Sequence, residues 1–274
     1  LKEKKLIYQN IAEGKTKIII GTHAVFQEGV TYKDLSLVIY DEQHRFGVSQ
    51  RLKLKEKAED YPHQLLLSAT PIPRTMAMGV LSGLDISTIK SLPPNRTPIV
   101  TTTLPNNRRD ALINRIKSAI NKNSQVYWVC PLIDESESEL IGIEDLEKIL
   151  KKEFDSQDYE IIHGKMKDMD KQKILSDFKE KKTKILLATT VIEVGIDVPD
   201  ANIMVIENSE RFGLAQLHQL RGRVGRGEKE SFCILMHNDS LTELPEKRLQ
   251  IITETNDGFV IAEEDLKLRG PGDI

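Results

Sequence analysis

The sequence predicts an α/β fold in which parallel sheets are flanked by helices. Short runs rich in β-branched residues alternate with amphipathic helical stretches, and several of these runs are apolar on both faces. Strands that are buried on both faces belong to parallel sheets, whose connections are usually made by helices. The chain has 274 residues, of which 39% are hydrophobic, and this suits about two domains with apolar cores.

The apolar runs predict eight strands, and the stretches between them predict six helices. The strands are expected at 17–21, 35–42, 64–70, 126–132, 159–164, 184–190, 202–208 and 231–237. The helices are expected at 73–81, 109–120, 144–154, 171–181, 214–222 and 245–255. A further charged helical segment is expected at the N-terminus.

A linker is expected at 91–100, where three prolines and an Asn-Arg pair interrupt both helix and strand patterns. It separates a first part, 1–95, from a second part, 96–240, and a helical tail follows at 241–274. The first part is short for a complete doubly wound domain. We therefore expect two lobes, of which the first is incomplete.

Composition and charge narrow the classes of function. The net charge is −3, so a nucleic-acid partner would need local basic patches such as the runs at 45–57 and 163–184. Taken alone, each run is most simply a solvated face, and so is the acidic run at 134–147. No apolar run approaches the roughly 20 residues that cross a bilayer. Cys130 and Cys233 lie in apolar runs without metal-ligand spacing, which indicates buried, reduced thiols in a cytosolic protein.

The segment Gly14-Lys15-Thr16 matches the end of the phosphate-binding loop of nucleotide hydrolases. That loop needs another glycine five residues before Gly14, a strand before it and a helix after it. Here Gln9 occupies the glycine position, the preceding residues are polar and helix-like, and the following run 17–21 is strand-like. A helix that ends at Gly14, with the glycine as a left-handed C-cap, explains the pattern more simply.

Two adjacent carboxylates, Asp41 and Glu42, end the apolar run 37–40. In nucleotide hydrolases the first carboxylate at such a position holds Mg²⁺, and a second can polarise the attacking water. A lone pair of this kind is more simply a charged strand end, but three further elements follow it in the chain. They are a strand-like run that ends in Ser68 and Thr70, the segment 184–207 with Thr189, Thr190, Gly195 and Asp197, and the segment 216–227 with Gln219, Arg223 and Arg226. Arg223 and Arg226 are three residues apart on an expected helix end, so both could face one anionic site.

Together, these four elements resemble motifs II, III, V and VI of the superfamily 2 helicases. Within that superfamily the chain is similar to the bacterial helicases that act on branched DNA. The resemblance runs across nearly the whole chain and rests on the segments DEQHRFGV, LLLSATPIPRTMAM, LPPNRTPI, QVYWVCPLI, IIHGKM, RFGLAQLHQLRGRVGRG and DLKLRGPGD.

The resemblance implies two RecA-like lobes with ATP bound in the cleft between them. Asp41 would bind Mg²⁺, Glu42 would activate water, and Asp197 and Gln219 would contact the nucleotide. Arg223 and Arg226 would be arginine fingers that stabilise charge on the transferred phosphoryl group. The residues expected to couple hydrolysis to DNA contact are His44, Ser68 and Thr70. Contacts to the DNA backbone, independent of base sequence, are expected from Thr22, His23, Lys165, Thr189 and Thr190.

The resemblance also locates the missing parts of the motor and its partners. In the family, Lys15 and Thr16 fall in a variable stretch, and the true phosphate loop would precede residue 1. Residues 1–274 alone are therefore expected to hydrolyse ATP negligibly. The implied function is the remodelling of replication forks and Holliday junctions in recombination and repair. Single-stranded-DNA-binding protein is a further implied partner of a monomeric protein in the bacterial cytoplasm, without membrane contact.

Two other functions stay open at this stage. One is a translocase that couples transcription to repair, although that family typically has Asp-Glu-Glu-Gln at motif II and Arg-Gly-Ala-Gly near its end. Gln43-His44 and the segment 269–272, Arg-Gly-Pro-Gly, favour the branched-DNA helicases instead. The other is a non-catalytic nucleic-acid-binding module, which an upstream phosphate loop would exclude. An RNA helicase fits less well, because such proteins more often carry Asp-Glu-Ala-Asp at motif II.

Overall fold

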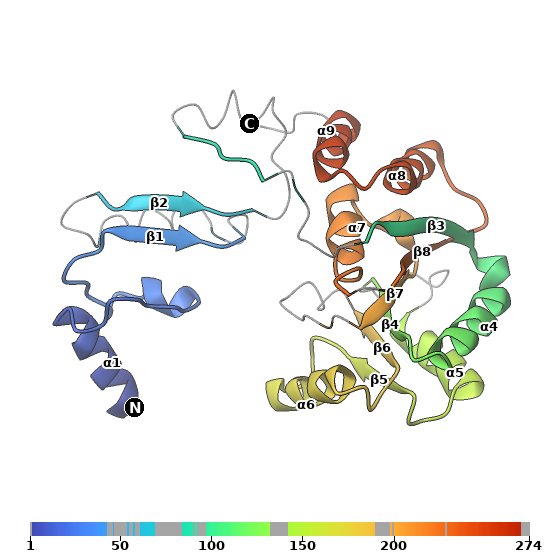
Figure 1. Ribbon diagram of the computed structural model, residues 1–274, viewed down its shortest axis with the longest axis horizontal. Coiled ribbons are helices and arrows are strands. Elements are labelled where there is room, and N and C mark those ends of the chain that lie inside the picture. The colour runs from blue at the N-terminus through green and yellow to red at the C-terminus, as the bar shows by residue number, and fades with distance from the viewer. Residues whose placement is uncertain are drawn as a thin grey trace. The chain divides into compact units, whose positions relative to one another are not determined.

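The computed structural model describes residues 2–42, 46, 54, 57, 61–68, 84–89, 91, 97–131, 142–189, 198, 200–227 and 229–269. The chain divides into two compact units, 1–69 and 70–274 (Figure 1). The predicted boundary at residues 95 and 96 and the predicted helix at 73–81 both lie outside the described residues.

Among the described residues of the first unit are a helix, α1 (Lys2–Ala12), a short 3₁₀ helix, η1 (His23–Phe26), and two strands. The strands β1 (Leu37–Tyr40) and β2 (His63–Leu66) pair in parallel. Val38 and Tyr40 point to one face of this pair and are buried against a small apolar cluster. On the other face Leu37 and Ile39 are about half exposed (54% and 55%), so only one face of the described pair is covered.

Gly14 ends α1 and does not form a phosphate loop. Its φ is +69°, and the amides of Gly14 and Lys15 donate to Ile11 O (3.0 Å) and Asn10 O (2.9 Å). These two hydrogen bonds define a Schellman C-cap, in which a glycine adopts the left-handed conformation. The expected helix end at Gly14 is confirmed.

The strand expected at 17–21 is wrong. These residues have no regular structure, and Ile18 and Ile20 are 81% and 95% exposed. A run of isoleucines favours a strand only where a neighbouring strand accepts its backbone hydrogen bonds. In the described part of the first unit, the sheet consists of β1 and β2 alone.

The second unit is built on a six-stranded parallel sheet with the order β3-β8-β7-β4-β6-β5. Its strands are β3 (Ile99–Pro105), β4 (Gln125–Cys130), β5 (Tyr159–Ile162), β6 (Ile185–Thr189), β7 (Ala201–Ile206) and β8 (Ser231–His237). Its helices are α4 (Arg109–Ile120), α5 (Ile143–Glu153), α6 (Asp168–Lys179), α7 (Leu214–Arg221), α8 (Glu243–Glu254) and α9 (Gly258–Arg269). Two 3₁₀ turns, η3 (Asn106–Arg108) and η5 (Ser209–Arg211), precede α4 and α7.

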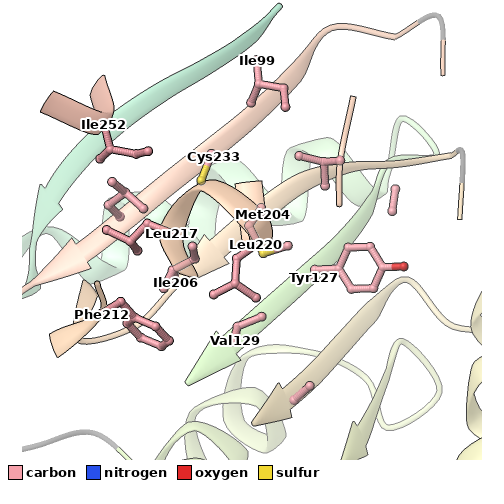
Figure 2. Close-up of a cluster of buried hydrophobic side chains, with 14 of the residues drawn as sticks. Ile99, Tyr127, Val129, Met204, Ile206, Phe212, Leu217, Leu220, Cys233 and Ile252 are labelled. Atoms are coloured by element: carbon pink, nitrogen blue, oxygen red, sulfur yellow. The ribbon is translucent and has the colours of Figure 1, made fainter. Parts of the chain in front are cut away.

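Helices cover both faces of this sheet, so the second unit has three layers. Alternate residues of each central strand enter different cores, as Trp128 and Tyr127 of β4 do. Trp128 packs among residues of α4 and α5, whereas Tyr127 belongs to the core beneath α6, α7, α8 and α9 (Figure 2). The predicted α/β class with parallel sheets and flanking helices is thereby confirmed.

The edge strand β3 was not predicted, because its residues read as the end of the linker. Three consecutive threonines, 101–103, follow Val100, which is 52% exposed. A strand at a sheet edge buries little on its outer side, so its apolar pattern is weak. Apart from the strand at 17–21, each strand that the sequence predicted is confirmed, with ends that differ by a few residues.

In the part of the chain that the structure describes, the helices are too short or too polar to cross a membrane.

The two cysteines should be inert in the folded protein. Burial raises the pKa of the Cys130 thiol to about 12, with a smaller contribution from the negative charge of Glu207, and burial alone raises the pKa of Cys233 to about 12. Because the thiolate is the reactive form, we expect no labelling by a thiol-specific disulfide reagent at pH 8 until the protein is unfolded. Rapid labelling of the folded protein would contradict this.

The same pKa shifts predict a loss of stability at high pH. In the unfolded chain the thiols lose their protons near pH 9, whereas in the folded protein they keep them to about pH 12. The folded state therefore binds more protons across this window, and the free energy of unfolding should fall as the pH rises through it. Replacing both cysteines by alanine should reduce this part of the pH dependence, which denaturant titrations at several pH values can measure.

Candidate functional site

The carboxylates predicted to act on ATP lie at the carboxyl ends of the paired strands of the first unit. Asp41 and Glu42 follow β1, and Ser68 follows β2. Tyr40 lies opposite Leu66, and the amide of Leu67 donates to Tyr40 O (2.8 Å), so the pairing continues past both strands. The structure therefore brings Asp41, Glu42 and Ser68 to the same edge of the β1–β2 pair.

Glu42 has an unusual backbone conformation, with a φ of +53°. A glutamate at positive φ is uncommon, because its Cβ crowds the backbone in the left-handed region. Strained conformations of this kind cluster at functional sites. A strained backbone at this position is what we expect where the direction of the Glu42 side chain matters for function.

The aromatic ring of Phe46 packs against two other aromatic rings of the first unit. Tyr40 is 2% exposed, and the ring of Phe46 lies 5.6 Å from the rings of both Tyr40 and Phe26 in edge-to-face geometry. Edge-to-face pairs at this distance are favourable. Phe46 itself therefore packs against the core of the first unit and against η1.

Two side chains donate hydrogen bonds to backbone carbonyls of residues 25–30, the segment that follows Thr22 and His23. Tyr32 Oη donates to Val25 O (2.9 Å), and Lys57 Nζ donates to Gln27 O (2.5 Å) and Val30 O (2.8 Å). Burial lowers the pKa of Lys57, which fits an ammonium used within the fold. At least this member of the basic run 45–57 therefore has a structural role and is not part of a solvated face.

Two of the predicted DNA-contacting residues lie at one edge of the second sheet. Thr189 ends β6, and Lys165 lies three residues after β5, the neighbouring strand. Since all pairs in this sheet are parallel, their carboxyl ends share an edge. Lys171 Nζ donates to Gly164 O (3.1 Å) and orders the turn that presents Lys165, which is exposed.

The predicted nucleotide-contacting residues of the second unit lie on α7 and in the turn after it. Gln219 is half-buried on α7, whereas Arg223 and Arg226 come after the helix, which ends at Arg221. The prediction that both arginines lie on a helix end is wrong. Gly222, and then Gly225 with a φ of +78°, lead the chain out of the helix into a turn.

This turn lies at the other edge of the sheet. It connects α7 to Ser231, the first residue of β8, which pairs with Ile99, the first residue of β3. Arg223 and Arg226 are therefore near the amino ends of these strands, whereas Lys165 and Thr189 are at the carboxyl ends. The remaining predicted residues His44, Thr70, Thr190 and Asp197 lie outside the described residues, and of His23 only the backbone is described.

Arg221, a buried arginine that was not predicted as a site residue, lies just before the turn 222–227 that carries Arg223 and Arg226, called the finger turn below. Arg221 is 2% exposed, and its guanidinium donates to Ile252 O (2.7 Å) and Thr255 O (2.9 Å), the last carbonyls of α8, and to His218 Nδ1 (3.0 Å). Burial lowers the pKa of Arg221. Its spacing from Leu214 and Leu217 places it on the apolar face of α7, a signal that could have marked it as buried.

A second arginine makes the reciprocal connection. Arg248 of α8 donates to Phe212 O (3.0 Å) and Glu210 O (2.9 Å), just before α7. Both ends of α7 are therefore bound to α8 through charged hydrogen bonds to carbonyls, which are stronger than neutral ones. The helix that precedes the finger turn is thus fixed to the helical tail.

A buried ion pair also escaped the sequence analysis. Glu207 is fully buried at the end of β7 and accepts bonds from Arg109 Nη1 (2.5 Å), Arg109 Nη2 (2.8 Å) and Trp128 Nε1 (2.9 Å). A buried carboxylate is tolerated when it is paired and hydrogen-bonded in this way. The pair fixes the start of α4 to the carboxyl edge of the sheet.

Comparisons with known proteins give this arrangement a class. Residues 2–78 match the model of the DEAD/DEAH box helicases, and residues 107–228 match the model named helicase conserved C-terminal domain. The two models lie on either side of the predicted linker. On both sides of that linker the chain is therefore similar to helicases of superfamily 2.

The more specific similarity is to RecG. The chain is 51% identical over 278 residues to the ATP-dependent DNA helicase RecG of Pasteurella multocida, a match that covers 100% of this chain and 40% of that protein. It is 51% identical to the protein of the same name from Escherichia coli K12, over 96% of this chain and 39% of that protein. The predicted resemblance to this kind of helicase is confirmed, and the chain spans about 40% of the length of these relatives.

A solved structure gives the same result. The structure of RecG bound to a three-way DNA junction superposes with a TM-score of 0.76 and 42% sequence identity, over 99% of this chain and 35% of that chain. The similarity therefore holds for the fold as well as for the sequence.

Proposed function

We propose that this chain forms part of an ATP-dependent DNA helicase that remodels branched DNA. The observation that carries the proposal is the similarity to RecG along the entire chain, at 51% identity, together with the likeness to a RecG structure bound to a three-way junction. Replication forks and Holliday junctions, in recombination and repair, are the proposed substrates of the full-length protein.

ATP and Mg²⁺ are the proposed cofactors. Asp41 is exposed at a strand end, so its carboxylate can reach a metal, and Glu42 follows it. In the described part of the chain, no group of three or more His, Cys, Asp or Glu side chains could hold a metal alone. This fits Mg²⁺, which is typically bound by one or two carboxylates together with substrate phosphates and water, and which neutralises charge on those phosphates. In our proposal Asp41 binds the metal and Glu42 accepts a proton from the attacking water.

The second unit would supply the charge that stabilises the transition state and part of the DNA track. We assign Arg223 and Arg226 to the developing charge on the transferred phosphoryl group, with Gln219 and Asp197 contacting the nucleotide. Lys165, Thr189 and Thr190 are assigned to the DNA backbone, with Thr22 and His23 of the first unit. His44, Ser68 and Thr70 would link the two activities. The separation of Arg226 and Lys165 at opposite sheet edges supports distinct nucleotide and DNA roles.

The partners beyond branched DNA are also part of the proposal. We infer that the full-length protein is a monomer of the bacterial cytoplasm that is recruited by single-stranded-DNA-binding protein. Size-exclusion chromatography with light scattering, with and without that protein, measures both the oligomeric state and the association.

Unwinding of model forks by the full-length protein tests the central proposal. We expect ATP-dependent separation of a labelled three-way junction, and ATP hydrolysis that is stimulated more by forked than by linear duplex DNA. An absence of ATP hydrolysis with every DNA would contradict the proposal. Capture of RNA polymerase together with removal of a stalled transcription complex, without fork unwinding, would assign the protein to the transcription-repair coupling translocases.

Binding of forked DNA should weaken steeply with salt. Each phosphate that a cation neutralises contributes about −0.9 to the slope of log affinity against log salt for duplex DNA. Lys165→Ala should therefore reduce the magnitude of this slope by about one. Fluorescence anisotropy of a labelled fork measures this slope, at salt concentrations between about 50 and 200 mM.

Lys122→Ala is the matched control for that measurement. Lys122 is also an exposed lysine in a turn, but it lies between α4 and β4, at the amino edge of the sheet. We expect its slope to equal that of the wild type. A slope that changes equally in both variants, or in neither, would remove Lys165 from the DNA contact.

A further inference from the structure

The turn that carries Arg226 is held by a backbone hydrogen bond and by the burial of Val224 and Gly225. The amide of Arg223 donates to Leu220 O (3.0 Å), and Val224 is fully buried in the core beneath α7. Gly225 is buried and adopts a φ of +78°. Arg226 Nε donates to Gly222 O in a long hydrogen bond of 3.5 Å.

Ile99 closes the space against which this turn rests. A Cβ atom placed on Gly225 would lie 2.9 Å from Ile99 Cγ1 and 3.2 Å from Ile99 Cδ1, and 3.6 Å from Thr97 O. Distances near 3 Å are shorter than carbon–carbon contacts at their optimum, so Gly225 is in tight contact with Ile99. Ile99 is itself 9% exposed and belongs to the core cluster that contains Leu217 and Leu220 of α7 (Figure 2).

Polar contacts join the same two segments. Thr97 Oγ1 donates to Lys229 O (3.3 Å), which also accepts from Ser231 Oγ (3.2 Å). Lys229 Nζ donates to Asn123 O (2.9 Å), which ties the end of the turn to the end of α4. Thr97 and Lys229 are 132 residues apart in sequence, and their contact joins the residues before β3 to the turn after α7.

The contact made by Ile99 and Thr97 is of interest because of where these two residues lie in the chain. Both residues belong to the proline-rich stretch 91–100 that the sequence predicts as the linker between the lobes. We propose that Ile99 is a positioning residue for Arg226, so that the end of the linker holds the turn that presents the arginine to the nucleotide phosphates. This inference rests on the proposed function for the role of Arg226, and on the contacts above for the role of Ile99.

The first test is a kinetic comparison of Ile99→Ala, Ile99→Val and Ile116→Ala in the full-length protein. A displacement of about 1 Å at a catalytic group can cost about 10²-fold in rate. We expect Ile99→Ala to lower kcat for DNA-stimulated ATP hydrolysis by about 10- to 100-fold, with the KM for ATP and the fork affinity within about twofold. Ile99→Val should restore most of kcat, because valine keeps a carbon atom at the Cγ1 position, which makes the closest approach to Gly225.

Ile116→Ala is the matched control. Ile116 is 1% exposed in the core on the opposite face of the sheet, so the same truncation should lower the melting temperature without lowering kcat of the folded enzyme. If Ile99→Ala changes only the melting temperature, as the control does, the positioning role is wrong and Ile99 is merely structural.

A second test uses the tight contact itself. Gly225→Ala should impair turnover, because the new methyl group meets Ile99 and because alanine is strained at a φ of +78°. In the double variant Ile99→Ala, Gly225→Ala the colliding atoms are gone, so kcat should exceed that of Gly225→Ala alone. A double variant that is as slow as the product of the two single effects would contradict the contact.

A third measurement does not depend on the proposed function. Hydrogen exchange of the peptide that covers residues 222–230, followed by mass spectrometry, reports how firmly the turn is held. We expect faster exchange in Ile99→Ala and no change in Ile116→Ala. If the wild type lacks ATP hydrolysis, the proposed function fails while this result can still hold. If exchange of the turn is the same in Ile99→Ala and in the wild type, the positioning role fails even in an active helicase.

Discussion

Replacing Glu42 by glutamine in the full-length protein should reduce ATP hydrolysis to near background. The substitution keeps the size of the side chain and removes the carboxylate that would accept a proton from water, and general-base catalysis is typically worth about 10²- to 10⁴-fold. Asp41 and Ser68, which share the strand edge with Glu42, are unchanged. Nucleotide affinity, measured by titration with a fluorescent ATP analogue, should therefore stay within about threefold of the wild type, on the order of half a kcal/mol.

The control for this prediction is Glu3→Gln, the same change at an exposed position on α1. It should leave both hydrolysis and nucleotide binding unchanged. Retention of wild-type turnover by Glu42→Gln would exclude Glu42 as the general base. If hydrolysis and ATP binding were lost together, Glu42 would instead be needed to hold the nucleotide or the fold of its strand end.

Replacing Arg226 by alanine should produce a comparably large loss of turnover. An arginine that stabilises charge on the transferred phosphoryl group is worth about 10³- to 10⁵-fold. Arg226→Lys should recover only part of this, because lysine keeps the charge but not the planar fork that donates two parallel hydrogen bonds. Steady-state hydrolysis with saturating forked DNA measures kcat for all three proteins.

Fork affinity separates a nucleotide role from a DNA role for this arginine. Because Arg226 lies at the amino edge of the sheet and Lys165 at the carboxyl edge, Arg226→Ala should bind forks within about twofold of the wild type, on the order of 0.4 kcal/mol. Arg115→Ala, an exposed arginine on α4, is the matched control and should change neither quantity. A large loss of fork binding in Arg226→Ala would reassign this residue to the DNA interface.

The sequence was informative wherever a local pattern and the tertiary fold agree. The buried strands β4, β6 and β7 are apolar on both faces, which is the pattern that a parallel sheet requires, and each was predicted. The C-cap at Gly14 was predicted because the left-handed conformation strongly favours glycine. The sequence predicted that Asp41 and Glu42 end one strand and that Ser68 ends another, and in the structure these two strands are paired, so the three residues share an edge.

The errors arose where the environment decides the outcome. Ile18 and Ile20 have strong strand propensity but no neighbouring strand among the described residues, so the local pattern misled. Arg221 was missed because charged residues are usually expected at the surface, whereas the carbonyls that satisfy it belong to α8, more than thirty residues later. The strain at Glu42 and the placement of Arg223 and Arg226 beyond the helix depend on backbone angles that residue types alone do not specify.

The strand order in the sheet of the second unit determines when each strand can pair while the chain is synthesised on the ribosome. β3 is the first strand of that sheet to be translated, but the strand beside it is β8, the last one, and the partners Ile99 and Ser231 are 231 − 99 = 132 positions apart. At about 5–20 residues per second, roughly 7 to 26 seconds pass between them. The strands β4, β5, β6 and β7 can pair with one another during this interval, whereas β3 must wait for β8 to leave the exit tunnel. A nascent chain that does not yet include β8 would therefore carry β3, together with Ile99, without its partner strand.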